Sequence, residues 1–99
     1  MFLDEHIQEI KKLCEQNSVR TLYAFGSVLT DRFNDKSDID LLVDIDAEGY
    51  KDYADRYFDL KFSLEDMLHR KIDLLEETAI RNKYLREELE ETKSLIYGA

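Results

Sequence analysis

Two aspartates at alternating positions open an apolar segment and are the first residues here that could do chemistry. Asp38 and Asp40 begin the stretch 38–45, which reads DIDLLVDI. Residues i and i+2 of a strand point to the same face, roughly 6.5–7 Å apart, so the two carboxylates would project together. Carboxylate oxygens are the ligands that Mg²⁺ prefers. The pair therefore supplies half of a hard-cation site.

Asp73 is the candidate for a third carboxylate. It lies in the stretch KIDLL, among apolar residues where an unpaired charge would be costly. Contributed by a neighbouring strand, it would complete a two-metal arrangement. A simpler alternative stays open, in which Asp38 ends a loop, Asp40 faces solvent and Asp73 pairs with a lysine or arginine.

A glycine and a serine mark the end of another strand-like segment. Gly26 and Ser27 follow the β-branched and aromatic run 19–25. After such a strand, exposed backbone N–H groups and a hydroxyl can bind a phosphate. By itself a Gly-Ser pair is a weak signal.

The apolar periodicity predicts the elements that must position these side chains. It favours helices over about 2–16, 50–69 and 79–97, and strands over 19–25, 38–45 and 70–76. In the last helix we expect four residues to face inward, namely Leu85, Leu89, Thr92 and Ile96. The nearly continuous apolar run of the second strand is typical of a strand in the middle of a sheet covered by helices.

Length, charge and cysteine content limit the function further. The 99 residues are enough for one domain, 1–99. With 23 acidic and 14 basic side chains the formal net charge is -9, which disfavours nucleic acid and anionic membranes as partners. Cys14 is the single cysteine and continues an apolar stripe, so we expect a buried, inert thiol. Because the chain also lacks a signal-like or membrane-spanning pattern, we expect a cytoplasmic protein.

Taken together, the motifs resemble those of one known family. Gly26-Ser27, nine intervening residues, the stretch Ser37-Asp38-Ile39-Asp40-Leu41 and a later strand aspartate, Asp73, are similar to the signature of minimal nucleotidyltransferase (MNT) domains of the polymerase-β superfamily. The order of elements over about 2–97 agrees with this resemblance. It implies an α/β (α+β) fold, with a small mixed sheet flanked by helices.

The resemblance also implies an activity and a site. A domain of this family binds ATP with two Mg²⁺ ions and transfers the nucleotidyl group. The family pattern implies that Gly26, Ser27 and Ser37 contact the nucleotide. It also implies that Asp38, Asp40 and Asp73 hold metal and carry the catalysis.

A partner follows from the same resemblance. Many members are antitoxins that adenylylate a tyrosine of a small helical HEPN-type toxin. Many relatives carry basic residues after the Gly-Ser, whereas this chain has Val28-Leu29-Thr30-Asp31, although Arg32 or Lys36 could substitute. The alternative is therefore an antitoxin of weak or absent activity that acts by stoichiometric binding. The acceptor, the base preference and self-association are not determined by the sequence.

Overall fold

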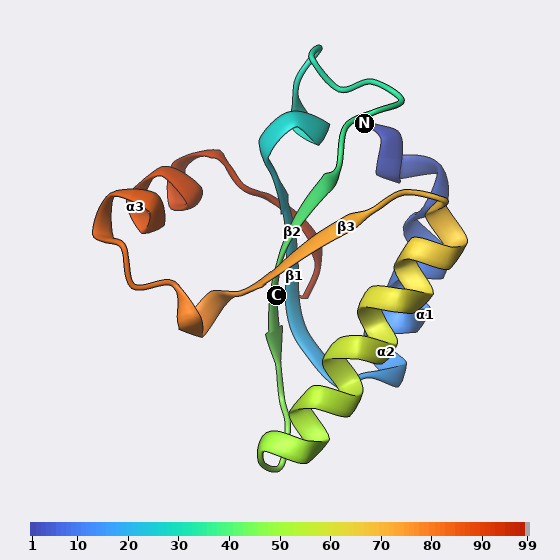
Figure 1. The fold of residues 1–99 in the computed structure, drawn as a ribbon, viewed down its shortest axis with the longest axis vertical. Coiled ribbons are helices and arrows are strands. Elements are labelled where there is room, and N and C mark those ends of the chain that lie inside the picture. The colour runs from blue at the N-terminus through green and yellow to red at the C-terminus, as the bar shows by residue number, and fades with distance from the viewer. Residues whose placement is uncertain (99) are drawn as a thin grey trace.

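The structure, a computed structural model, describes residues 1–98 as a sheet with helices on both sides (Figure 1). In chain order the helices and strands are α1 (Ile7–Gln16), β1 (Val19–Phe25), β2 (Ile39–Ile45), α2 (Tyr50–Leu68), β3 (Ile72–Glu76), α3 (Lys83–Thr92) and β4 (Ser94–Tyr97). Three 3-10 turns join them, η1 (Phe2–His6), η2 (Gly26–Leu29) and η3 (Glu77–Ala79). The Gly-Ser pair thus begins η2, and the first predicted helix is α-helical only from Ile7.

The sheet is mixed and has the strand order β3-β2-β1-β4. β1 runs antiparallel to both β2 and β4. β2 and β3 are parallel, and α2 connects them, because parallel neighbours need a crossover connection. This architecture confirms the predicted fold class.

The core lies between the sheet and the two helices α1 and α2, which share one side of it (Figure 1). Leu60, Leu64 and Leu68 of α2 are buried there, as their helical spacing predicts. Cys14 of α1 is fully buried, and burial raises the pKa of its thiol to about 12. The thiol is therefore protonated and unreactive at neutral pH, as expected.

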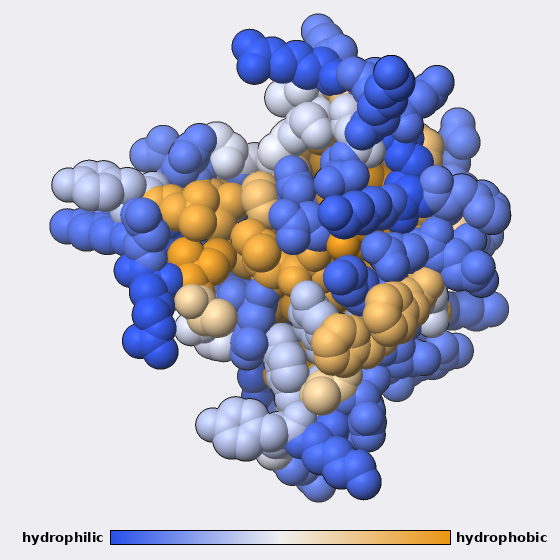
Figure 2. All heavy atoms as spheres, in the orientation of Figure 1, coloured by the Kyte–Doolittle hydropathy of each residue, from blue (hydrophilic) through white to orange (hydrophobic). Residues whose placement is uncertain are grey.

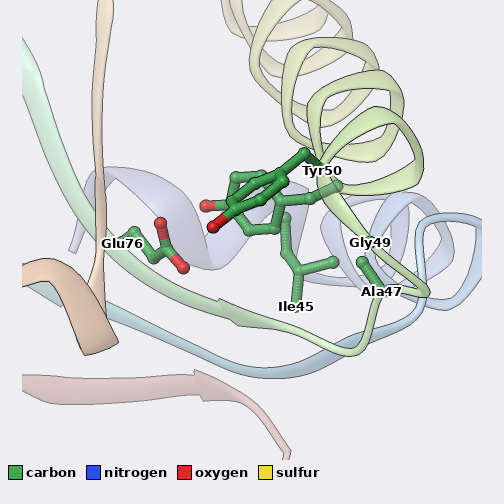
Figure 3. Close-up of a pocket in the computed structure, with 6 residues that line it drawn as sticks. Ile45, Ala47, Gly49, Tyr50 and Glu76 are labelled. Carbon is green, nitrogen blue, oxygen red and sulfur yellow. The ribbon is translucent and has the colours of Figure 1, made fainter.

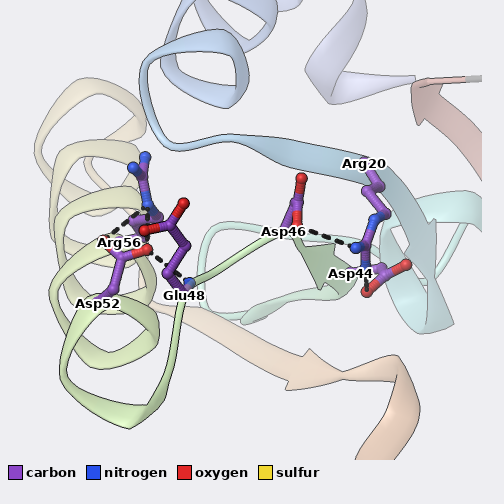
Figure 4. A network of polar contacts seen from close by, with 6 residues as sticks. All are labelled: Arg20, Asp44, Asp46, Glu48, Asp52 and Arg56. Carbon is purple, nitrogen blue, oxygen red and sulfur yellow. Dashed lines mark hydrogen bonds and ion pairs between the residues drawn. The ribbon is translucent and has the colours of Figure 1, made fainter.

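Charged side chains fix the far end of β2, where the chain turns into α2 (Figure 4). Arg20 on β1 donates to Asp44 at 3.4 Å and to Asp46 at 3.0 Å. The Asp52 carboxylate accepts the backbone N–H of Glu48 at 2.9 Å, just before the helix begins. These contacts hold the end of β2 that lies away from Asp40.

The prediction of one helix over 79–97 is wrong at both ends. α3 begins only at Lys83, because the Asn82 side chain accepts the N–H groups of Tyr84 and Leu85 and so caps the helix there. It ends at Thr92, and the next residues pair with β1 as β4. An open edge of β1 offers unpaired backbone groups, and pairing with them overrides the local helical spacing.

The inward residues predicted for that helix are correspondingly only half right. Leu89 on α3 and Ile96 on β4 are buried. Leu85 is 38% exposed, and Thr92 is exposed as well. Within residues 1–98, no helix combines the length and apolar character needed to cross a bilayer.

Candidate active site

Asp40 and Asp73 are direct neighbours in the sheet. The parallel pairing of β2 and β3 sets Asp40 opposite Asp73. Residues paired in this way project from the same face. That face is the one that α1 and α2 leave uncovered, and α3 lies on its side of the sheet (Figure 1). Asp38 lies just before β2 rather than within it, and its side chain is exposed.

The three aspartates interact electrostatically at Asp40. Partial burial, followed by the negative charges of Asp73 and Asp38, raises the pKa of the Asp40 carboxyl above its usual value. Each cause disfavours the ionised form in the absence of a cation. A bound cation would reverse this effect, so the arrangement favours a positively charged ligand.

Gly26 links the Gly-Ser motif to the aspartates. Its backbone has φ +74°, and a Cβ built on it would lie 2.5 Å from Oδ2 of Asp40. The preceding residue, Phe25, pairs with Asp40 across β1 and β2. Both the conformation and the space at this position therefore require glycine.

A broad cavity opens beside this glycine, between η2 and α3. Its volume is about 860 Å³, which is in the size range of small-molecule sites. The residues that line it include Gly26, Ser27, Asp31, Arg32, Leu85 and Leu89. The cavity thus brings Gly26 and Ser27 together with two leucines of α3, next to Glu88 and Thr92 of the same helix. Ser37 does not line it.

The unusual sequence after the Gly-Ser pair has a structural reason. Val28 is 4% exposed and belongs to the core, so its position has no room for a charged group. The Thr30 hydroxyl donates to the carbonyl of Ser27 at 2.9 Å and closes the turn. Arg32 lines the cavity, and among residues 1–98 its guanidinium has no ion-pair partner. Of the two suggested substitutes, Arg32 therefore lies at the cavity and Lys36 does not.

Arg70 is a residue of the site that the sequence did not point to. Its guanidinium donates to the backbone carbonyls of Asn34 and Ser37. It also lies over the rings of Phe33 and Phe2, at 4.5 Å and 5.3 Å from the ring centroids. These contacts hold the loop that leads into Asp38, and they join residues 33 positions or more apart. No local pattern could have revealed them.

Ser37 is occupied within this same loop. Its hydroxyl oxygen accepts the backbone N–H of Asn34 at 3.1 Å. The structure therefore gives Ser37 a loop-forming role, and a contact between Ser37 and a nucleotide stays a prediction.

The donor set suits Mg²⁺ without forming a closed cage. In residues 1–98, no three His, Cys, Asp or Glu side chains gather closely enough to enclose a metal ion. Mg²⁺ is usually held by one or two carboxylates, with water and substrate phosphates completing its shell. The paired Asp40 and Asp73 fit such an open site, and their roles as ligands stay a prediction.

Comparison with known proteins agrees with this geometry. The family model described as polymerase beta, nucleotidyltransferase matches residues 8–99. A Methanocaldococcus jannaschii protein named "Putative protein adenylyltransferase" is 39% identical over 88% of this chain and 84% of its own length.

Two solved structures share the fold. A protein described as a "putative minimal nucleotidyltransferase" superposes with a TM-score of 0.77 at 25% identity, covering 93% of this chain and 90% of its own. A chain from the complex of a tri-AMPylated Shewanella oneidensis HEPN toxin with an MNT antitoxin gives a TM-score of 0.66 at 22% identity, covering 100% of this chain and 74% of its own. With the family model matching nearly its whole length, this chain belongs to the polymerase beta nucleotidyltransferase family.

Proposed function

We propose that this protein transfers AMP from ATP to a hydroxyl group of a partner protein, in a reaction that depends on Mg²⁺. The observation that carries the proposal is the pairing of Asp40 with Asp73, together with the close approach of the Asp40 carboxylate to the glycine of the Gly-Ser turn. The name of the archaeal relative supports transfer to a protein. The complex of an AMPylated HEPN toxin with an MNT antitoxin supports a small helical toxin as the acceptor.

The residues that line the cavity and the three aspartates, which do not line it, would take separate roles in this reaction. Gly26 and Ser27 would bind the triphosphate through backbone N–H groups and the hydroxyl, and Arg32 would add a positive charge. Asp38, Asp40 and Asp73 would hold Mg²⁺, which lowers the pKa of the attacking hydroxyl and neutralises the phosphates when bound. The hydroxyl oxygen forms a bond to the α-phosphorus, the bond to the bridging oxygen breaks, and pyrophosphate leaves.

In this proposal, Asp73 would receive the proton that the attacking hydroxyl loses. Its side chain is exposed, whereas that of Asp40 is partly buried beside it. A partner protein can therefore approach Asp73 more readily. We expect Asp73→Asn to reduce transfer by orders of magnitude while changing MgATP affinity little, and Asp40→Asn to impair both.

A second candidate function is inhibition of the partner by binding alone. The observation that favours it is the turn Val28-Leu29-Thr30-Asp31, which brings no positive charge to the cavity and places Asp31 in its lining. In this case the aspartates would be remnants of an ancestral site.

One experiment separates the two functions. The protein is incubated with MgATP and a small helical protein encoded in the neighbouring reading frame, and both chains are weighed by intact-protein mass spectrometry. We expect the partner to gain the mass of one or more AMP groups, and Asp73→Asn to abolish the gain. A stable complex whose partner keeps its original mass would establish the binding function instead.

A further inference from the structure

A second, smaller pocket lies at the other end of the parallel strands (Figure 3). Its volume is about 270 Å³. It is lined by Ile45, Ala47, Gly49, Tyr50, Tyr53 and Glu76. These residues come from the end of β2, the first turn of α2 and the end of β3. None of them is basic.

This pocket is separate from the aspartate site. Glu76 pairs with Val43, while Asp73 pairs with Asp40. Because successive side chains of a strand alternate between faces, Glu76 and Asp73 project from opposite faces of the sheet. Ile45 also lies five residues beyond Asp40, which is roughly 16 Å along a strand. The proposed nucleotide chemistry therefore makes no use of this pocket.

The pocket presents two side chains, Tyr53 and Glu76, with unused hydrogen-bonding capacity. The Tyr53 hydroxyl is buried and, within the described part of the chain, has no hydrogen-bond partner. One Glu76 carboxylate oxygen accepts the Thr78 hydroxyl at 2.8 Å, and no residue among 1–98 donates to the other. Burial, followed by the Glu76 carboxylate, which acts through its negative charge and as the nearest acceptor for the phenol proton, raises the pKa of the Tyr53 hydroxyl, so it stays neutral. The neutral hydroxyl can turn its proton toward Glu76, which leaves lone pairs on both groups to accept from a ligand that donates.

The surrounding groups favour a donor that is positively charged. Tyr50 is 96% exposed, and its side chain reaches from α2 toward Glu76 (Figure 3). Tyrosine rings attract cations through their faces. The first turn of α2 opposes a cation through its dipole, and the Asp52 carboxylate in that turn is already paired with Arg56, so the attraction must come from Glu76 and the tyrosine ring. A net charge of -9 for the whole chain acts in the same direction as Glu76.

We propose that this pocket binds an alkylammonium or guanidinium group, with Glu76 as its counter-ion and the Tyr53 hydroxyl as a second acceptor. Such a group would come from a lysine or arginine side chain of a protein partner or from a small free amine. Its donors would satisfy both acceptors, and its alkyl chain would pack against Ile45 and Ala47.

The test compares a charged probe with a neutral one of the same shape. Isotope-labelled protein is titrated with n-butylammonium and, separately, with 1-butanol, and amide shifts are followed by NMR. We expect saturable shifts near Ile45, Tyr53 and Glu76 with n-butylammonium only. Saturating MgATP should leave them unchanged. Equal binding of both probes, or shifts that centre on Asp40 and Asp73, would overturn the proposal.

Two variants test the named contacts. Glu76→Gln should weaken n-butylammonium binding about ten-fold, because it removes a charge-assisted hydrogen bond. Tyr53→Phe removes only a neutral acceptor and should weaken it about three-fold. Glu91→Gln makes the same change on the exposed surface of α3 and should have no effect. Unchanged affinity in a folded Glu76→Gln or Tyr53→Phe protein would contradict the assigned contacts, and Tyr53→Phe carries the test if Glu76→Gln does not fold.

A third probe identifies the source of the cation. Lysine blocked at both backbone ends carries the same ammonium group on a peptide-like backbone. Binding at least as tight as that of n-butylammonium would indicate a side chain of a protein partner. Binding of n-butylammonium but not of blocked lysine would indicate a small free amine.

Discussion

At Gly26, a single hydrogen in place of a side chain decides whether the Gly-Ser turn can close over Asp40. The backbone there has φ +74°, which other residues adopt only at a cost. The space is taken as well, since a Cβ would lie 2.5 Å from the Asp40 carboxylate. Two separate costs therefore act on any substitution.

We expect Gly26→Ala to lower the free energy of unfolding by about 1–3 kcal/mol, through backbone strain and the displacement of Asp40. It should also abolish MgATP binding. Gly49→Ala is the matched control, because Gly49 has φ +108° but no atom within 4 Å of its built Cβ, so it tests backbone strain alone. Chemical denaturation and calorimetry measure both quantities. Equal stability and nucleotide affinity in the two variants would show that the contact with Asp40 is unimportant.

Asp40 itself should destabilise the metal-free protein at neutral pH. Its folded-state pKa is raised by burial and by Asp73 and Asp38. Below the unfolded carboxyl pKa of about 3.9, Asp40 is protonated in both states and has no effect. As the pH rises from that value through the raised folded-state pKa, ionising this carboxyl costs the folded state more free energy than the unfolded state. The wild type therefore loses stability over this range.

Asp40→Asn should therefore melt higher than the wild type at about pH 7 in EDTA, by up to ~5 °C, and the difference should vanish near pH 3. Asp66→Asn, an exposed change on α2, is the control and should show no such trend. Added Mg²⁺ should stabilise the wild type more than Asp40→Asn. A variant that melts lower at neutral pH would mean that the Asp40 carboxylate makes a stabilising contact.

At the scale of elements, the loop between η2 and β2 depends on one distant side chain. Arg70, just before β3, is the residue that holds the carbonyls of Asn34 and Ser37. Because Asp38 follows this loop directly, the position of its carboxylate depends on Arg70. We regard Arg70 as a positioning residue rather than a catalytic one.

Arg70→Lys keeps the charge but loses the planar fork that spans two carbonyls. We expect amide hydrogen exchange in the loop Asn34–Asp38 to accelerate about ten-fold or more, and MgATP affinity to fall several-fold. Exchange in the core strands should change little. Lys71→Ala alters the neighbouring exposed residue and should leave the loop unchanged. Unaltered exchange in the loop of Arg70→Lys would show that other contacts hold it.

Most elements, but not all of their contacts, could be predicted from the sequence. β1, β2 and α2 have strong local patterns, and the parallel register of β2 and β3 brings together Asp40 and Asp73, which the sequence named. The pattern failed at Ser94–Tyr97, where the partner that makes β4 a strand lies some seventy residues earlier in β1. The Arg70 contacts and the Tyr53-Glu76 pocket also depend on tertiary structure, which local spacing does not encode.

At the scale of the whole molecule, the two sides of the sheet are used differently. α1 and α2 close one side over the core, while α3 covers the other only in part. Figure 2 shows apolar side chains gathered between α3 and the strands. Leu85, at 38% exposed, contributes to this open wall of the cavity beside Gly26. An apolar wall opposite a phosphate-binding turn is suited to a nucleotide, which has one apolar and one charged end.

The overall charge adds a condition to nucleotide binding. The chain carries a net charge of -9, and Asp38, Asp40 and Asp73 concentrate negative charge near the site where the triphosphate would bind. At an effective dielectric constant near 20, two like unit charges about 4 Å apart repel each other by ~4 kcal/mol. Only Arg32 among the residues lining the cavity opposes this repulsion. A divalent cation bound between the carboxylates and the phosphates would turn this repulsion into a net attraction.

We therefore expect ATP to bind at least about 100-fold more tightly with Mg²⁺ than with EDTA in isothermal titration calorimetry. In EDTA, raising the salt concentration should tighten the residual ATP binding, because salt screens the repulsion between the triphosphate and the aspartates. If ATP were instead attracted to a basic site, added salt would weaken its binding.

Arg32→Gln should reduce MgATP affinity, and Lys36→Gln, which removes a charge of the same sign outside the cavity lining, serves as its control. Equal ATP affinity with and without Mg²⁺ would mean that the triphosphate binds away from the aspartates. The pairing of Asp40 with Asp73 would then have to be explained by something other than metal-dependent nucleotide transfer.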